Sequence, residues 1–227
     1  MTEASTAMGL ADLPRNGGWL CLDYTNTVEP RTGPVHRDWL TGYPDLVEWA
    51  RHGGVLADAD AAALLRSAVD RPAVARAAFR TAIELREALF RLFQAIADGT
   101  EPTDPDLQAL RDAFVTATGH GRLDPGGTGF EWSWAGAVPA GASGDVPGDR
   151  LDRPWWPVAV SAVDLLTRGP LDRVKRCPIE GGGCSWLFVD ATKNRSRRWC
   201  SMEDCGSQVK SRRQTDRRRA TRRRAAT

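Results

Sequence analysis

The chain has 227 residues, of which 41% are apolar, and its formal net charge is only +2. This length suits one medium domain, or a domain with a small module, and the apolar share is sufficient for a hydrophobic core. A mean hydropathy of −0.40, without any run of about 20 apolar residues, argues against a membrane protein. Residues 1–14 lack the basic and apolar regions of a secretory signal, so we expect a cytoplasmic protein.

The first predicted element is a short apolar run at residues 19–22, which follows two glycines. The run is typical of a buried strand or of an extended segment that enters the core. Asp23, Thr25, Asn26 and Thr27 follow directly, and short polar side chains of this kind commonly form turns or caps. The alternative is that they line the mouth of a pocket.

Helical periodicity dominates the next part of the chain. The segment 43–56 has apolar residues at helical spacing and a stop at Gly53–Gly54, which predicts a short helix. Residues 71–97 combine a narrow apolar sector with a charged opposite face, which predicts a central packing helix of about seven turns. A Pro-rich segment then leads into another predicted helix through residues 107–114.

Aromatic residues mark the second half of this acidic body. Phe130, Trp132 and Trp134 alternate with polar residues, which predicts a half-buried strand. The Gly-, Ala- and Pro-rich residues 135–150 predict a mobile loop. A helix with Pro157 in its first turn is then expected to run to Gly169–Pro170, where we place a domain boundary.

The body shows no recognisable catalytic arrangement. Its three histidines lie far apart in the sequence, and it has neither a phosphate-binding Gly-rich loop nor a Gly-x-Ser-x-Gly elbow, so we expect no enzyme. The tryptophans have two interpretations: they pack the core, which is at least as good an explanation, or they wall an apolar ligand pocket. The candidate pocket residues are Trp19, Asp23, Asn26, Trp132, Trp155 and Trp156.

Charge is divided unevenly along the chain. Residues 171–227 hold 16 Lys and Arg against 6 Asp and Glu, a balance of +10, whereas the remainder stands at −8. Such asymmetry indicates a nucleic acid or another polyanion as the partner of the basic part. The alternative is a solvated charged surface without a specific partner.

Four of the five cysteines fall within 29 residues, at Cys177, Cys184, Cys200 and Cys205. In a reducing compartment, this clustering predicts a closed tetrahedral site in which four thiolates bind one structural Zn²⁺. The spacing of the first pair is wide, but the glycines at 181–183 make it feasible. A disulfide pair and free buried thiols are the alternatives.

The residues between the cysteine pairs predict a small β structure. Residues 186–189 form a β-rich run, 193–196 a turn and 197–199 a return strand, and a helix is expected to begin between Cys200 and Cys205. This order is that of a treble-clef finger, in which the positive end of the helix dipole favours thiolate charge.

The chain from Val209 onwards is predicted to be a helix that is basic on nearly all sides. Such a helix cannot bury itself in protein, so duplex DNA fits it best, with arginines neutralising phosphates. The alternative is a solvated or disordered tail.

These residues resemble the CGNR zinc-finger family, whose finger follows a domain called ABATE in stress-induced transcription regulators. The carrying motifs of the finger are RCP, WLFVD and RRWCSMEDCG, and those of the body are LCLDYTNT, DLVEWA and PWWPVAVSAVDLL. The resemblance covers roughly residues 15–218, and the finger is its more specific part.

The resemblance implies DNA binding by the finger and regulation through the body, and it maps the family's zinc ligands onto the four clustered cysteines. One departure is that Cys205-Gly206-Ser207-Gln208 stands where the family has Cys-Gly-Asn-Arg. Gln208 is suited to the edge of an adenine, or it is neutral. The candidate DNA contacts are Arg197, Arg198, Gln208, Lys210, Arg212, Arg213 and Arg217.

We therefore expect an α+β, mainly α protein with an ABATE-like helical sensor or dimerisation domain (15–169), a zinc finger (171–218) and a basic tail (219–227). Its expected function is that of a DNA-binding transcription regulator. A small-molecule effector and a second copy of the chain are further candidate partners. The competing classes are an RNA-binding protein that stacks bases on Trp186 or Trp199, and an interaction module in which zinc only stabilises the fold.

Overall fold

The computed structural model describes residues 9–31, 37–127, 129–134, 150–178, 184–207, 209–211 and 214–215. It confirms the expected fold class, because most described residues are helical and the strands are short. The loop expected at 135–150 lies, except for Arg150, outside the described residues. Within the described part of the chain, no helix is both long and apolar enough to cross a membrane.

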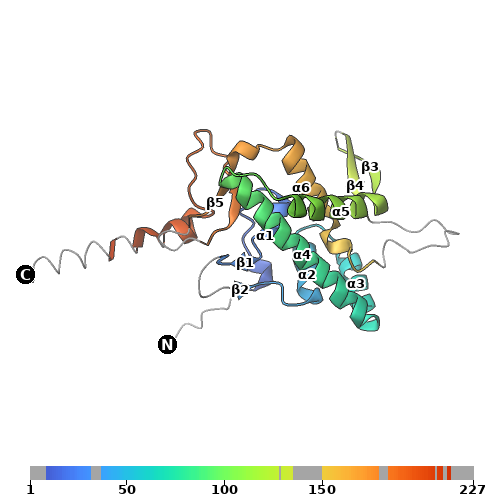
Figure 1. Ribbon diagram of the computed structural model, residues 1–227. Helices are drawn as coiled ribbons and strands as arrows, with labels where there is room; N and C mark the ends of the chain where they lie inside the picture. The colour runs from blue at the N-terminus through green and yellow to red at the C-terminus, as the bar shows by residue number, and fades with distance from the viewer. Residues whose placement is uncertain are drawn as a thin grey trace, which may run out of the picture.

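The helices follow the predicted order along the chain, and Figure 1 shows how they pack around one long helix. The α-helices are α1 (Leu20–Thr25), α2 (Tyr43–His52), α3 (Asp58–Asp70), α4 (Pro72–Ala97), α5 (Asp104–His120) and α6 (Trp156–Arg168). Short 3₁₀ turns are η1 (Leu10–Asp12), η3 (Arg153–Trp155) and η4 (Leu171–Arg173), and η5 (Met202–Gly206) is a π-helical turn.

Helix α4 is the central packing element, as its periodicity predicted. It begins with a proline at its first position, where no backbone N–H is needed, and it ends at Asp98 before Gly99, whose φ of +71° suits glycine. Its buried face contacts α1, α2, α3 and α5, and the Tyr24 hydroxyl donates to the Ala82 carbonyl oxygen at 2.7 Å. The helix therefore spans the body, with its C-terminal end beside strand β5 (Figure 1).

The apolar run at 19–22, expected as a strand or extended segment, is instead the start of helix α1. This short helix is buried on nearly all sides, with Cys21, Leu22 and Tyr24 fully covered. A short apolar run without a polar face does not distinguish a buried helix from a buried strand, which explains the error.

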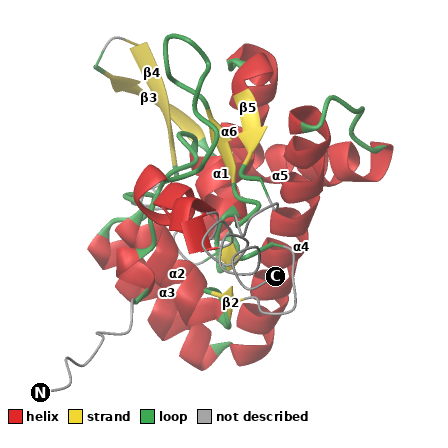
Figure 2. Ribbon diagram, turned by 90° about the vertical axis from the view of Figure 1, so that its left-hand side faces the viewer, coloured by secondary structure: helices red, strands yellow, loops and turns green. Residues whose placement is uncertain are grey.

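The strands of the described residues form antiparallel pairs, of which β3 and β4 extend away from the helices (Figure 2). The predicted strand around Trp132 is β4 (Gly129–Ser133), and it pairs with an unpredicted strand β3 (Arg122–Gly126). The shorter pairs are β1 (Val28–Glu29) with β2 (Arg37–Asp38), and β5 (Val174–Arg176) with β6 (Leu187–Val189). The β-rich run at 186–189 therefore pairs with residues before the first clustered cysteine, and the return strand expected at 197–199 is absent from this described segment.

Residues 16–31 join the body to the β5–β6 hairpin. The Asn26 carboxamide donates to the Leu187 carbonyl oxygen and accepts from the Leu187 N–H, both at 2.9 Å. The Trp186 indole N–H donates to the Val28 carbonyl oxygen at 2.8 Å. One continuous hydrophobic core includes residues of the body and of this hairpin, so the two parts pack as one unit.

We expect Asn26→Ala to lower the free energy of unfolding by roughly 2–4 kcal/mol, because it leaves the buried N–H and carbonyl of Leu187 without partners. Urea unfolding followed by tryptophan fluorescence measures this loss. The matched control is Gln108→Ala, an exposed amide that we expect to change stability by less than about 0.5 kcal/mol. Equal stabilities of the two variants would contradict the role given to Asn26.

Candidate metal centre and ligand cavity

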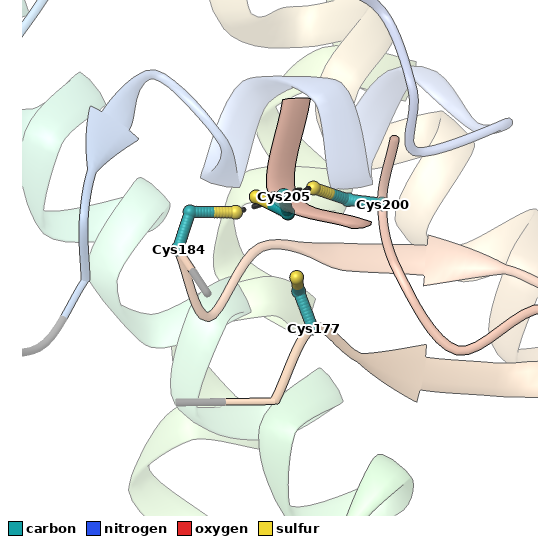
Figure 3. Close-up of side chains that lie close together, drawn as sticks. All are labelled: Cys177, Cys184, Cys200 and Cys205. Carbon is teal, nitrogen blue, oxygen red and sulfur yellow. Dashed lines mark hydrogen bonds between the residues drawn. The ribbon is translucent and has the colours of Figure 1, made fainter. Parts of the chain in front are cut away.

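The four clustered cysteines converge on one point, as Figure 3 shows. Cys177 follows strand β5, Cys184 lies shortly before β6, and Cys205 is in η5. Their Sγ atoms all lie within 4.8 Å of one another, with Cys184 and Cys200 at 3.2 Å and Cys200 and Cys205 at 3.6 Å. All four side chains are buried, and none forms a disulfide.

This donor set fits one structural Zn²⁺. Four thiolates around a tetrahedral ion at about 2.3 Å from each sulfur lie just under 4 Å apart, and the observed spacing is of that order. A divalent cation among the four converging sulfurs would lower the pKa of each thiol, which favours the thiolates that bind metal. In contrast, burial raises the pKa of the isolated Cys21 to about 12.

The backbone around Cys205 is arranged for close packing. The Ser201 hydroxyl accepts from the Asp204 N–H at 3.1 Å and caps the start of η5, which confirms the helix expected to begin between Cys200 and Cys205. A Cβ atom on Gly206 would lie 2.9 Å from the Met202 sulfur and 3.2 Å from Trp199 Cδ1, so a larger residue here would require the exposed Met202 side chain to move. This glycine is the part of the Cys-Gly-Asn-Arg motif that the chain keeps.

Asp190, which the sequence interpretation did not single out, organises the loop between the cysteine pairs. It is fully buried and accepts from Lys175 Nζ at 2.6 Å, from the Thr192 N–H and hydroxyl at 2.9 and 2.6 Å, and from the Arg197 N–H at 3.0 Å. Burial alone would raise the pKa of Asp190, but the hydrogen bonds from Lys175 and Thr192 hold it well below its usual range. The sequence signal that could have identified this residue is its position as the last residue of the WLFVD motif.

The Arg197 side chain is used inside the finger. Its guanidinium donates to the carbonyl oxygens of Asn16 at 3.0 Å and Trp199 at 3.0 Å, and also to that of Cys200. The same group lies over the Phe188 ring, with Cζ at 4.4 Å from the ring centroid. These contacts use Nε and Nη2, whereas Nη1 has only a 3.4 Å contact with the Val189 carbonyl oxygen, so a DNA contact by Arg197 stays a prediction.

Of the other candidate contacts, Arg198 and Lys210 are exposed. Arg198 lies beside a cavity of about 690 Å³, here called the finger cavity, which is also lined by Thr192, Ser196 and Ser201. The remaining candidates, Gln208, Arg212, Arg213 and Arg217, lie outside the described residues.

The structure places the expected ligand residues in different environments. Trp19, Asp23 and Trp132 line one cavity of about 680 Å³, here called the body cavity. Asn26 instead bonds Leu187, and Thr25 and Thr27 bond carbonyls of their own helix, which is the local capping expected of them. Trp155 and Trp156 are core residues at 3% and 0% exposure, and neither lines the body cavity.

Trp134, one of the tryptophans expected to wall a pocket, also lines the body cavity. Two further lining residues, Arg15 and Arg153, were not predicted. The two arginines carried no comparable signal, because a lone arginine is usually a surface residue.

Asp23 has an unusual environment at the edge of the body cavity. Its Oδ1 accepts from the Gly17 N–H at 2.8 Å, and a Cβ atom on Gly17 would lie 2.9 Å from that oxygen. Burial raises the pKa of Asp23 to about 6, although the Gly17 hydrogen bond and the charge of Arg15 act in the opposite direction.

Comparison with family models identifies both parts of the chain. Residues 18–169 match the ABATE model, described as "Putative stress-induced transcription regulator", and residues 173–218 match the CGNR zinc finger. These matches confirm the resemblance seen in the sequence motifs. Among curated proteins, none matches the chain significantly.

We expect Cys205→Ser to reduce the bound metal to well under one zinc per chain, because a serine hydroxyl is a poor substitute for a thiolate ligand. Elemental analysis of the purified protein measures the zinc content. The control is Cys21→Ala, which removes a buried cysteine outside the cluster and should retain one zinc. Full zinc occupancy in the Cys205 variant would contradict the four-thiolate site.

We expect Asp23→Asn to change how stability depends on pH. Because the pKa of Asp23 is raised from 3.8 to about 6 on folding, its contribution is fully present below pH 3.8 and is lost as pH rises through about 6. Asparagine does not titrate, so its side chain causes no such loss. Between pH 4 and 7 the free energy of unfolding of the variant should therefore rise by about 2 kcal/mol relative to that of the wild type. Urea unfolding across this range is the measurement, with Asp112→Asn as an exposed control. Parallel pH profiles for wild type and Asp23→Asn would refute the raised pKa.

Proposed function

Since the chain belongs to the ABATE family and carries a CGNR zinc finger, we propose that it is a transcription regulator that binds duplex DNA through this finger. The observation that carries the proposal is the +10 balance of residues 171–227, which contrasts with the −8 of the remainder. Attraction to phosphates acts over the whole basic segment, and the zinc centre supplies the rigid base for it. Both matched families are regulator and zinc-finger types rather than enzyme families.

We assign the finger to the treble-clef arrangement. In support, the first cysteine pair lies between the paired strands β5 and β6, and the last ligand lies in a helical turn. The basic segment follows this turn in the sequence. Within it, we propose these residues as contacts to phosphates and bases: Gln208, Lys210, Arg212, Arg213 and Arg217.

Arg198, which precedes Cys200 in the sequence, is a further proposed contact. It is exposed, and the finger cavity beside it is also lined by the hydroxyl-bearing Ser196 and Ser201 and by Glu203. Guanidinium and hydroxyl donors together suit phosphate oxygens. Phosphate contacts of this kind would set the position of the finger on the duplex without reading sequence.

Single-stranded RNA is the less favoured partner. Its recognition by stacking needs accessible aromatic faces, whereas Trp186 and Trp199 are only 3% and 9% exposed, and the Trp186 indole N–H is bonded within the protein. The remaining competitor is a finger that only stabilises the fold, which predicts no affinity for nucleic acid.

The proposed parts are the sensor or dimerisation domain at 15–169, the finger at 171–218 and the basic tail at 219–227. Because body and hairpin share one core, we propose that the boundary at Gly169–Pro170 separates functions rather than independently folding units. A cytoplasmic location is part of the proposal and is supported by the four-thiolate metal site, because a reducing compartment keeps such cysteines out of disulfides.

We expect Arg198→Ala and Lys210→Ala each to weaken duplex binding several-fold and to lower the slope of log affinity against log salt by about 1. The control is Arg122→Ala, an exposed arginine on strand β3 of the body. Gel-shift titrations with duplex and single-stranded probes at several salt concentrations measure both quantities.

The outcomes of these titrations separate the classes. Duplex binding that exceeds single-strand binding, with a preferred sequence recovered from a random pool, supports the regulator. A palindromic preferred site would support a homodimer. Weak binding without preference at about 50 mM salt, or equal losses in the Arg122 control, would overturn the proposal.

A further inference from the structure

The loop between strand β6 and Cys200 concentrates positive charge on the surface of the finger. Residues 191–198, here called the basic loop, include Lys193, Arg195, Arg197 and Arg198 and contain no Asp or Glu. Residues 191–196 and Arg198 are exposed. The sequence predicts only a turn at 193–196, but an exposed cluster of cations attracts a polyanion.

Lys175 on strand β5 holds the backbone of the basic loop from inside the finger. Its Nζ donates to Asp190 Oδ2 at 2.6 Å, and to the carbonyl oxygens of Arg195 at 2.6 Å and Arg197 at 3.2 Å. An ammonium group has three N–H donors, so these bonds use its whole donor capacity. Lys175 is therefore a structural residue of the loop rather than a contact to a partner.

Arg173, the last residue of η4, is a second internal cation beneath the loop. Its Nη1 donates to the carbonyl oxygens of Asp190 at 3.1 Å and Thr192 at 2.9 Å. In contrast, the backbone N–H groups of Lys193 and Asn194 form no hydrogen bond with the described residues. Carbonyl oxygens repel phosphate, so a loop that directs several of them at internal cations and keeps N–H groups and cationic side chains outside favours an anion.

The basic loop already has a defined shape in the protein alone. The Thr192 hydroxyl accepts from the Ser196 N–H at 3.0 Å, and the Thr192 carbonyl oxygen accepts from the Arg195 N–H at 3.2 Å. The buried Asp190 accepts from the N–H groups of Thr192 and Arg197, near the two ends of the loop. A partner therefore meets a preformed backbone, and the entropy cost of ordering that backbone does not reduce the affinity.

Asp172 of η4 is an acidic group beside the basic loop. Its Oδ2 lies 2.6 Å from Arg195 Nη1, and the two side chains are 59% and 54% exposed. An ion pair this exposed contributes little to folding stability. It does, however, occupy a guanidinium that would otherwise be free to meet a phosphate, so a phosphate has to displace the Asp172 carboxylate.

We propose that the basic loop is a second phosphate-binding surface of the finger, which contacts the backbone of duplex DNA through Lys193 and Arg195. In this surface, Asp172 competes with the phosphate for Arg195. The inference rests on the proposed DNA-binding function and adds to it a contact outside the basic segment that follows Cys205. Phosphate contacts carry no base information, so the loop adds affinity on every duplex, and Asp172 limits this nonspecific affinity.

Gel-shift titrations of the full zinc-loaded chain test the surface with a duplex of the preferred sequence and a duplex of scrambled sequence. We expect the double variant Lys193→Gln/Arg195→Gln to weaken binding to both duplexes by the same factor, about tenfold. The slope of log affinity against log salt should fall by about 1–2, because up to two phosphate contacts are lost. Both substituted side chains are exposed, so the variant should retain one zinc per chain.

The matched control is Arg76→Gln/Arg80→Gln, which removes the same charge from two exposed positions of α4. It should leave both the affinity and the salt slope unchanged. Wild-type affinity in the loop variant, a loss confined to the preferred duplex, a loss seen only with a single-stranded probe, or an equal loss in the control would overturn the proposal.

Asp172→Asn tests the competition, and here the expected change has the opposite sign. Duplex binding should become about two- to threefold tighter, the fold-change that corresponds to an exposed ion pair, because Arg195 is released. In the Arg195→Gln background the same substitution should have little effect. The control is Asp124→Asn, which removes the partner of the exposed Arg122 on β3 and should not change the affinity. No gain, or an equal gain with and without Arg195, would refute the competition.

Failure of the proposed function is recognised separately in these titrations. A wild-type chain without affinity for duplex DNA removes both proposals. A chain whose duplex binding depends on Lys210 but not on Lys193 and Arg195 removes only the second surface.

Discussion

The pairing of Asn26 with Leu187 is the interaction on which the arrangement of the whole molecule depends. A single carboxamide replaces a missing neighbouring strand, because it gives the edge strand β6 both an acceptor and a donor in a dry environment. With this edge satisfied, the hairpin that flanks the first cysteine pair can be buried against α1 and α4. The metal centre therefore has a packed protein wall on one side.

Much of this architecture could be predicted from the sequence, wherever a repeated physical pattern existed. The 3.6-residue periodicity of α4 extends over 26 residues, so a structure other than a helix is hard to reconcile with it. The cysteine cluster was equally predictable, because four thiols in a short segment have few other roles in a reducing compartment. Burial of α6 followed from its apolar composition and its proline at the first turn.

The errors have a common cause: each depends on partners distant in sequence. Helix α1 was mistaken for a strand because the body covers all its sides, which removes the polar face that identifies a helix. The partner of β6 precedes the metal ligands instead of following them, and the local sequence favours neither arrangement. The local sequence also did not indicate that the guanidinium of Arg197, a candidate DNA contact, donates to the carbonyl oxygen of Asn16, 181 residues away. Likewise, only folding places Trp19 and Trp132 in the body cavity, Trp155 beside a second cavity of about 870 Å³ and Trp156 wholly in the core.

The way residues 16–31 cross between the two parts limits how this protein can be recombined. Zinc fingers are often regarded as cassettes that can be moved between proteins, but here the finger's inner strand is completed by an asparagine and by carbonyl groups of the other part. Exchange of the C-terminal segment alone would leave polar backbone groups facing a mismatched apolar surface. A functional chimera would therefore have to carry α1 and its flanking loops along with the finger, so the unit of exchange is discontinuous in sequence.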